Sequence, residues 1–274
     1  MAEGRRVLVI GPEPTPWSEW AADLVAHGPV LVALARKDFQ TRYKRASFGV
    51  LWAVVLPVVQ ALVLAVVFSK IARFDTGGWS YTTFVMSGIF AWAYVSGTAM
   101  AATTSVVEGA SLADKVWFPR AILALVPVLA NGVGLVISLL VLLVAIPLLG
   151  TWPGLSILLL VPASVLLLAL TTGLSLVLSA LQVYYRDTKF MVTAVLLVAL
   201  YLTPVIYPAD LLGEWEGWLA LNPVTGVVEL FHSGALGVGI DGRSLIVSVI
   251  ASAALLVGGA AAHRRHDRLF VDLL

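Results

Sequence analysis

Six stretches of the chain are apolar and long enough to cross a lipid bilayer as helices. A transmembrane helix needs about 20 apolar residues, and the stretches that qualify are 50–71, 81–107, 121–149, 157–183, 190–206 and 244–262. The fifth is short and ends in "TPVIYP", where Pro204 and Pro208 should break the helix. Since 60% of the residues are hydrophobic, 12% are charged and the mean hydropathy is +0.97, the composition lies outside the range of soluble domains. We therefore predict an all-α, polytopic membrane protein with six transmembrane helices.

The distribution of cations orients the predicted spans. Cytoplasmic loops collect Lys and Arg, and of the 17 such residues only Lys70, Arg73 and Arg243 fall on the other side. This asymmetry predicts that both termini are cytoplasmic and that the outer loops are 72–80, 150–156 and 207–243. The apolar run near the start is too short for a signal peptide, so residues 1–28 are expected to remain as a cytoplasmic segment. Tryptophans at the predicted span ends agree: Trp52 and Trp117 inside, and Trp79, Trp152, Trp215 and Trp218 outside.

The segment before the first span carries the densest positive charge in the chain. Pro29 suits the first position of a helix, and apolar residues then recur at spacings of three and four: Val32, Ala35, Phe39, Tyr43 and Ala46. Cations surround this apolar face. We predict an amphipathic interfacial helix over 29–46 that lies along the inner membrane surface. The alternative is a solvated basic anchor that has no further role.

The outer loop at 207–243 is too apolar for a simple exposed loop. Its sequence mixes Trp, Leu and Val with acids, and Asn222 followed by Pro223 is typical of a helix start. We predict a re-entrant outer helical hairpin between spans five and six, within the membrane domain that covers residues 47–274. The alternative is a pair of helices that lie flat outside the membrane.

The predicted spans carry few groups that could perform chemistry. Their clear polar side chains, apart from Ser and Thr, are Gln60, Asn131 and Gln182, and the chain has no cysteine. No Lys follows a Gly, so the phosphate-binding loop of ATPases is absent. The pair of histidines in "HRRH", at 263–266, is better explained as part of a basic membrane anchor than as a metal site. We expect no catalytic residues, no metal and no nucleic-acid binding, and we expect any ATP hydrolysis to occur in another polypeptide.

The inner loop at 108–120, "EGASLADKVWFPR", suits contact with such a partner. Ser111 could cap a short helix, Leu112, Val116 and Trp117 would supply apolar contacts, and Pro119 would end the helix. The alternative is a plain turn between two spans.

Four motifs together give the chain a family resemblance. They are "RKDFQTRYKRASFGVLWAVVLPVVQ" (36–60), "LADKVWFPRAI" (112–122), "YYRDTKF" (184–190), and "TPVIYP" with "NPVTGVVELF" (203–208 and 222–231). In order and spacing they resemble the membrane permeases of ABC-2 type polysaccharide exporters, which serve O-antigen, teichoic acid and galactan. The family usually has Arg-Asp where this chain has Lys37-Asp38.

The resemblance implies the assembly and its task. The expected complex is a homodimer of permeases in the inner membrane of a bacterium, bound to two copies of a separate ABC ATPase that uses ATP and Mg. The expected substrate is a polysaccharide linked to a polyprenyl diphosphate. Two other kinds of protein remain open, namely an intramembrane enzyme of cell-envelope glycan synthesis and an ATP-independent carrier or scaffold.

The resemblance also implies roles for particular residues. The residues expected to couple to the ATPase lie at 108–120: Ser111, Leu112, Lys115, Val116, Trp117, Phe118 and Pro119. The cations expected to meet the substrate diphosphate end the interfacial helix: Arg42, Lys44 and Arg45, of which the two Arg offer bidentate hydrogen bonds. The outer gate is expected to contain Tyr207, Trp215, Trp218, Asn222 and Pro223. Aromatic rings that could stack on sugars in the channel are Trp92, Tyr94 and Tyr201, although such rings in spans more often pack against helices or lipid.

Overall fold

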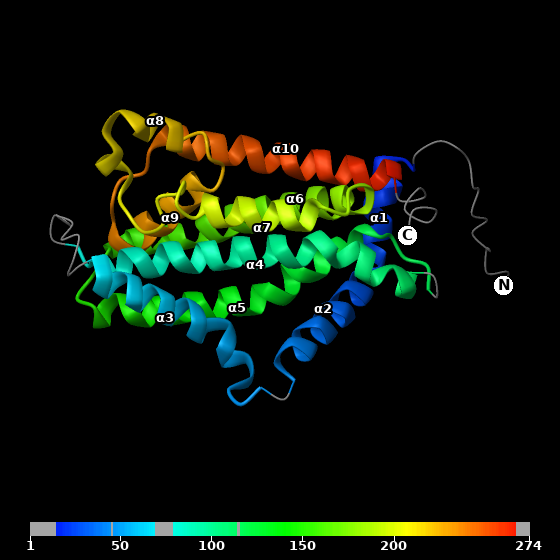
Figure 1. Cartoon of the computed structure of the whole chain (residues 1–274), viewed down its shortest axis with the longest axis horizontal. Helices are drawn as coiled ribbons and strands as arrows, with labels where there is room; N and C mark the ends of the chain where they lie inside the picture. Colours follow the sequence, from blue (N-terminus) through cyan, green and yellow to red (C-terminus); the bar gives the residue numbers. More distant parts are fainter. Residues whose placement is uncertain (1–14, 45, 69–78, 114–115, 267–274) are drawn as a thin grey trace.

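The chain is described by a computed structural model that covers residues 15–44, 46–68, 79–113 and 116–266. Within these ranges it is all-helical and contains no strand. The α-helices are α1 (Trp17–Ala26), α2 (Gly28–Tyr43), α3 (Trp52–Val67), α4 (Tyr81–Ala113), α5 (Ala121–Leu148), α6 (Leu160–Tyr184), α7 (Thr188–Ala199), α8 (Glu216–Leu219), α9 (Thr225–Leu236) and α10 (Gly242–His266). Short 3-10 helices are η1 (Gly49–Leu51), η3 (Gly154–Leu159) and η4 (Ala209–Trp215). They form one elongated bundle (Figure 1).

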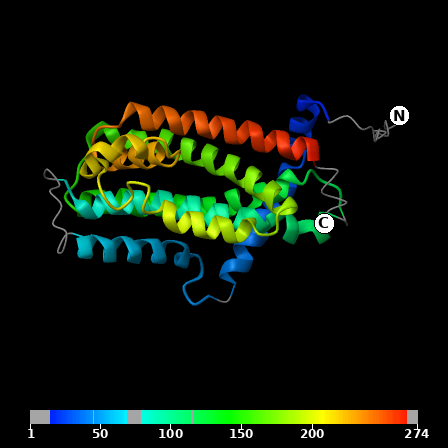
Figure 2. The same ribbon diagram turned by 45° about the horizontal axis from the view of Figure 1, so that its top comes forward.

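Five helical segments are long and apolar enough to cross a membrane: Gly49–Val67, Tyr81–Leu112, Ala121–Leu148, Gly154–Tyr184 and Gly242–Arg265. They correspond to five of the six stretches that the sequence predicted. The helix Tyr81–Leu112 is the most enclosed of the five: 72% of the residues in its most apolar stretch are buried, because α5, α6, α9 and α3 pack around it. In both views α4 runs through the middle, with α10 on one side and α3 on the other (Figure 2).

The remaining predicted span, 190–206, is not one continuous helix. Helix α7 has 12 residues and ends at Ala199, well before Pro204, and the chain continues in turns to Tyr207. Backbone carbonyls of these turns accept hydrogen bonds from side chains instead of from helical N–H groups. The pairs are Tyr207 hydroxyl to Tyr201 O (2.7 Å), Asn222 Nδ2 to Leu202 O (3.1 Å), His232 Nε2 to Pro204 O (3.0 Å) and Tyr81 hydroxyl to Ile206 O. The non-helical turns after α7 therefore depend on tertiary contacts as well as on Pro204.

Helices α6 and α10 run parallel to each other in close contact. A Cβ atom at Gly173 would lie 2.7 Å from Leu255 Cβ, and one at Gly259 would lie 2.6 Å from Leu176 Cβ. Small residues at these positions let the two backbones approach. Because the two helices point the same way, the chain between them must return along the bundle, and α7 is part of that return (Figure 1).

The N-terminal region contains more helix than the sequence predicted. Helix α1 lies inside the predicted cytoplasmic segment and packs Trp20 and Leu24 against the apolar cluster at one end of the bundle. The predicted helix at 29–46 is α2, which ends at Tyr43. Of its predicted apolar face, Ala35 is buried, but Val32 is 57% exposed because α2 packs on α5 along a different line.

The segment at 207–243 has two unlike parts. Residues of η4 and α8 project from the bundle, and the rings of Trp215 and Trp218 are each 68% exposed. Helix α9 is instead enclosed by α4, α6, α10 and η3, with Phe231 and Val228 completely buried. The predicted helix start at Asn222 and Pro223 is wrong by a few residues, because α9 begins at Thr225 after Val224; Asn222 Oδ1 instead accepts the N–H of Val224 at 3.0 Å in the turn before the helix. Helix α9 therefore does not lie on the surface of the bundle.

Candidate functional site

The link between α4 and α5, described here for residues 116–120, projects from the helices and is anchored to them. We call it the anchored projection. Val116 and Trp117 are each 56% exposed, whereas Phe118 is 4% exposed and packs in a cluster that includes Ile122. The Trp117 ring also meets the His27 ring edge to face, with centroids 5.4 Å apart. Two exposed residues are thus followed directly by a buried one that anchors the segment.

The predicted short helix at 108–120 is wrong in one respect. Ser111 and Leu112 belong to the last turn of α4, so Ser111 does not cap a separate helix. Helix α4 continues because nothing in its sequence before Ala113 stops it. Pro119 is buried at the approach to α5, and Lys115 lies outside the described residues.

A cavity of about 660 Å³ lies beside this projection, between α2, α4 and α5. Its lining carries both signs of charge, from Lys37 and Arg42 and from Asp38 and Glu108. Hydroxyl groups line it as well: Thr41, Thr104, Ser105 and Ser111. We call this space the charged cavity. Its donors and cations could hold a polar, anionic group.

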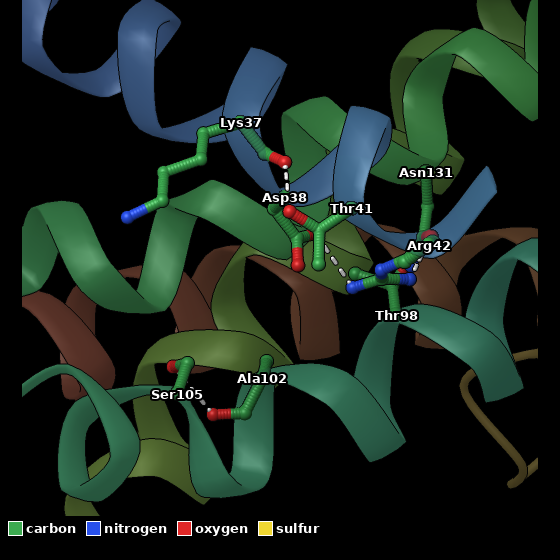
Figure 3. A network of polar contacts seen from close by, with 8 residues as sticks. All are labelled: Lys37, Asp38, Thr41, Arg42, Thr98, Ala102, Ser105 and Asn131. Atoms are coloured by element: carbon green, nitrogen blue, oxygen red, sulfur yellow. Dashed lines mark hydrogen bonds and ion pairs between the residues drawn. The ribbon is translucent and has the colours of Figure 1, made fainter. Parts of the chain in front are cut away.

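One chain of hydrogen bonds joins α2 to α4 and α5 at this cavity (Figure 3). Arg42 Nη2 lies 2.7 Å from Asp38 Oδ2, one helical turn away, and Arg42 Nη1 donates to Asn131 Oδ1 at 2.8 Å. Asn131 Nδ2 then donates to Thr98 Oγ1 at 3.1 Å. The side chains of Arg42 and Asp38 are 33% and 32% exposed, so solvent screening limits their ion pair to about 1 kcal/mol or less.

A second cavity of about 380 Å³ lies between α2, α3, α4 and α5. We call it the aromatic cavity, because its lining includes Phe39, Tyr43, Trp52, Phe90, Trp92 and Tyr94. Polar side chains also line it: Gln60, Ser96, Asn131 and Ser138. Aromatic faces beside hydrogen-bonding groups are suited to the two faces of a sugar ring, one apolar and one rich in hydroxyls.

The structure brings together only some of the predicted residues. Trp92 and Tyr94 both line the aromatic cavity, and the Tyr94 hydroxyl donates to Val128 O at 2.9 Å. Tyr201 lies apart from them, past the end of α7, with 60% of its surface exposed. Lys44 is exposed at the end of α2, and Arg45 lies outside the described residues.

Sequence reasoning did not assign Asp38 or Asn131 to this site. Asn131 was visible as a lone amide in an apolar span, and such groups seek partners. Asp38 precedes Arg42 by four positions, the spacing of a helical ion pair. The spacing could have linked Asp38 to Arg42, whereas the amide signal shows only that Asn131 needs a partner.

At the opposite end, the residues predicted for the outer gate separate into two groups. Tyr207 and Asn222 hold the turns after α7, and Asn222 Nδ2 also donates to Thr203 Oγ1 at 2.8 Å. Pro223 follows Asn222 in the turn before α9, while Trp215 and Trp218 project outward. Nearby, burial raises the pKa of Glu229, against hydrogen bonds from Ser244 and from the Asp241 N–H. Among the described residues, no group of three His, Cys, Asp or Glu is placed to hold a metal ion.

Comparison with known proteins identifies the family. Residues 29–236 match the family described as ABC-2 type transporter. The chain is 28% identical over 213 residues to an O-antigen export system permease protein RfbA of Klebsiella pneumoniae, covering 76% of this chain and 82% of that protein. It is 26% identical over 214 residues to the protein of the same name from Myxococcus xanthus, covering 77% and 82%. The resemblance that the sequence indicated is thereby confirmed, and the chain belongs to the ABC-2 type transporter family as a membrane permease.

Proposed function

We propose that this chain is the transmembrane subunit of an ATP-driven exporter that moves a polysaccharide linked to a polyprenyl diphosphate across the cytoplasmic membrane of a bacterium. The relatives are named as permeases of O-antigen export systems, which supports a polysaccharide as the cargo. The aromatic cavity supports the same class of substrate, since Trp92 and Tyr94 lie beside hydrogen-bonding side chains.

The observation that carries the proposal is the anchored projection between α4 and α5. Exposed Val116 and Trp117 offer apolar contacts to a partner, while buried Phe118 ties the same segment to the membrane helices. Movement of a bound partner would therefore reach α4 and α5. The partner is a separate ABC ATPase that uses ATP and Mg, present in two copies on a homodimer of this chain.

The proposed topology has six crossings, with both termini cytoplasmic. Five helices qualify as spans, and the parallel directions of α6 and α10 require one more passage of the chain between them. Helix α7 and the turns to Tyr207 would supply it. Non-helical backbone is tolerated at membrane depth only where protein satisfies its polar groups, and side chains satisfy the carbonyls of these turns.

The substrate would enter near the end of α2. Arg42, Lys44 and Arg45 would meet its diphosphate at headgroup depth, and the charged cavity beside Arg42 would receive it. An interfacial position of α2 belongs to this proposal. Helix α9 would form the outer gate as a re-entrant helix, supported by its enclosure between α4, α6 and α10.

The test of this proposal is binding of the ATPase. Trp117→Asp, and separately Leu112→Asp, should leave membrane insertion intact but abolish co-purification of the partner ABC ATPase, together with export. Trp152→Asp is the matched control, because Trp152 is 81% exposed at the opposite end of the bundle. Normal ATPase binding and export in both test variants would indicate that the projection is a plain turn with no coupling role, and would favour the carrier or enzyme alternatives.

A further inference from the structure

The charged cavity and the aromatic cavity lie next to each other along the same three helices, and we call the space along these helices the groove. Helices α2, α4 and α5 line both of them. On α5, Pro127 lines the charged cavity and Asn131, one turn further, lines the aromatic cavity. On α4, Ala101 and Gly97 are related in the same way. A group that moves along this groove from the charged cavity reaches the aromatic cavity next.

The Arg42 hydrogen bonds cross the groove at the boundary between the two cavities. Arg42 lines the charged cavity, Asn131 lines the aromatic cavity, and the 2.8 Å bond between them joins α2 to α5. Thr98, which accepts from Asn131, lies on α4 between Gly97 and Ala101. Figure 3 shows that the Lys37 ammonium group points away from this bridge, so Arg42 is the cation that closes it.

The partners of Arg42 differ in how they would respond to an anion. Asp38 is on the same helix as Arg42 and moves with it. Asn131 is a neutral amide on another helix, and a neutral acceptor holds a guanidinium less strongly than a phosphate does. A phosphate in the charged cavity would therefore compete with Asn131 for Arg42 and leave Asp38 in place.

We propose that the Arg42–Asn131 hydrogen bond is a latch that closes the passage from the charged cavity to the aromatic cavity, and that a diphosphate headgroup opens it by taking the Arg42 guanidinium. This inference rests on the proposed function, because it assigns the diphosphate-linked substrate to this groove. Asp38 and Asn131 are positioning residues. Asp38 holds the guanidinium against α2, and Asn131 fixes it across the groove.

A cysteine in the aromatic cavity reports the state of the latch. The chain has no native cysteine, and Ser96 is a half-buried residue that lines this cavity. In inside-out vesicles that contain the permease and its ATPase, Ser96→Cys should react slowly with a membrane-impermeant thiol reagent. Asn131→Ala should speed that reaction by roughly tenfold to a hundredfold, the equilibrium shift expected for loss of one hydrogen bond to a charged group. Ser111→Cys, in the charged cavity, is the control and should react equally fast in both backgrounds.

Asn131→Asp separates a latch from a simple clamp between helices. A carboxylate at 131 would bind Arg42 more strongly, so a latch should stay closed, the labelling of Ser96→Cys should slow and export should fall. A clamp that only holds α2 in place would be satisfied by the stronger bond, and export would stay normal. Normal export in Asn131→Asp, or unchanged labelling in Asn131→Ala, would overturn the latch without affecting the proposed export function.

The diphosphate is tested with inorganic pyrophosphate and with farnesyl diphosphate as probes. Either should speed labelling of Ser96→Cys in the otherwise native chain, and should have no effect when Arg42→Lys is added, because Lys lacks the bidentate geometry. Acceleration by farnesyl diphosphate alone would indicate that the isoprenyl chain is needed. If neither probe speeds labelling while ATPase binding and export are intact, a diphosphate does not open the latch, although the export function stands.

Discussion

His232 should stabilise the broken segment after α7, and His232→Phe tests how much. His232 is 3% exposed, its Nε2 donates to Pro204 O at 3.0 Å, and its ring stacks on Phe84 with centroids 3.8 Å apart. Phe keeps a flat ring against Phe84 but has no donor, so the Pro204 carbonyl loses this hydrogen bond in a dry site. Ser87, which bonds to His232 Nδ1 at 2.9 Å, can turn to Phe84 O instead, also at 2.9 Å.

The expected cost is therefore that of one buried carbonyl without a partner, about 1–3 kcal/mol. For a chain of this size, that lowers the melting temperature by roughly 2–12 °C. The assay is thermal unfolding in detergent together with export in cells. His232→Gln is the matched control, because its amide can donate to Pro204 and should recover part of the loss. An unchanged melting temperature in His232→Phe would refute the view that side-chain donors maintain the break.

Three further predictions concern the substrate site, the topology and the packing. The double variant Arg42→Lys with Arg45→Lys should insert and bind the ATPase but lose export, because Lys keeps the charge without the bidentate geometry; normal export would favour a mere basic anchor. Leu155→Cys, 85% exposed, should be labelled by an impermeant reagent from outside intact cells and Ser111→Cys should not; the reverse pattern would invert the topology. Gly259→Ala should destabilise the protein by about 1–3 kcal/mol in thermal unfolding, since its Cβ would lie 2.6 Å from Leu176 Cβ, whereas Gly258→Ala, with open space around it, should be neutral; equal stability of the two variants would contradict the close α6–α10 contact.

Much of the fold could be predicted because apolar length is a direct physical signal. Five of the predicted stretches became helices of membrane-spanning length. The stretch 190–206 was harder to predict. Its helix ends at Ala199, and the turns that follow are held by side chains distant in sequence, such as Tyr81 and His232. Helix α1 was not predicted, because it has only 10 residues and is too short to stand out as a span. Its Trp17, Trp20 and Leu24 do recur at helical spacing.

The candidate site was predictable only in its parts. Charge density drew attention to Arg42, and aromatic residues in a span drew attention to Trp92 and Tyr94. Nothing local indicated that Arg42 would meet Asn131, 89 positions away, or that the two cavities would share a groove. Tyr201 shows the opposite error, since an aromatic residue near a span end gives no sign of which face it occupies. The sequence shows which residues have suitable side chains, but only the packing of the helices shows which of them lie side by side.

ATP-driven export is the central claim, and reconstitution measures it most directly. The permease and its proposed ATPase partner would be placed together in proteoliposomes, with polysaccharide linked to a polyprenyl diphosphate supplied on the face that carries the ATPase. We predict that the substrate stimulates ATP hydrolysis, that polysaccharide appears on the opposite face only when ATP is present, and that Trp117→Asp abolishes both effects. Polysaccharide transfer by the permease alone, without the ATPase or ATP, would contradict the account.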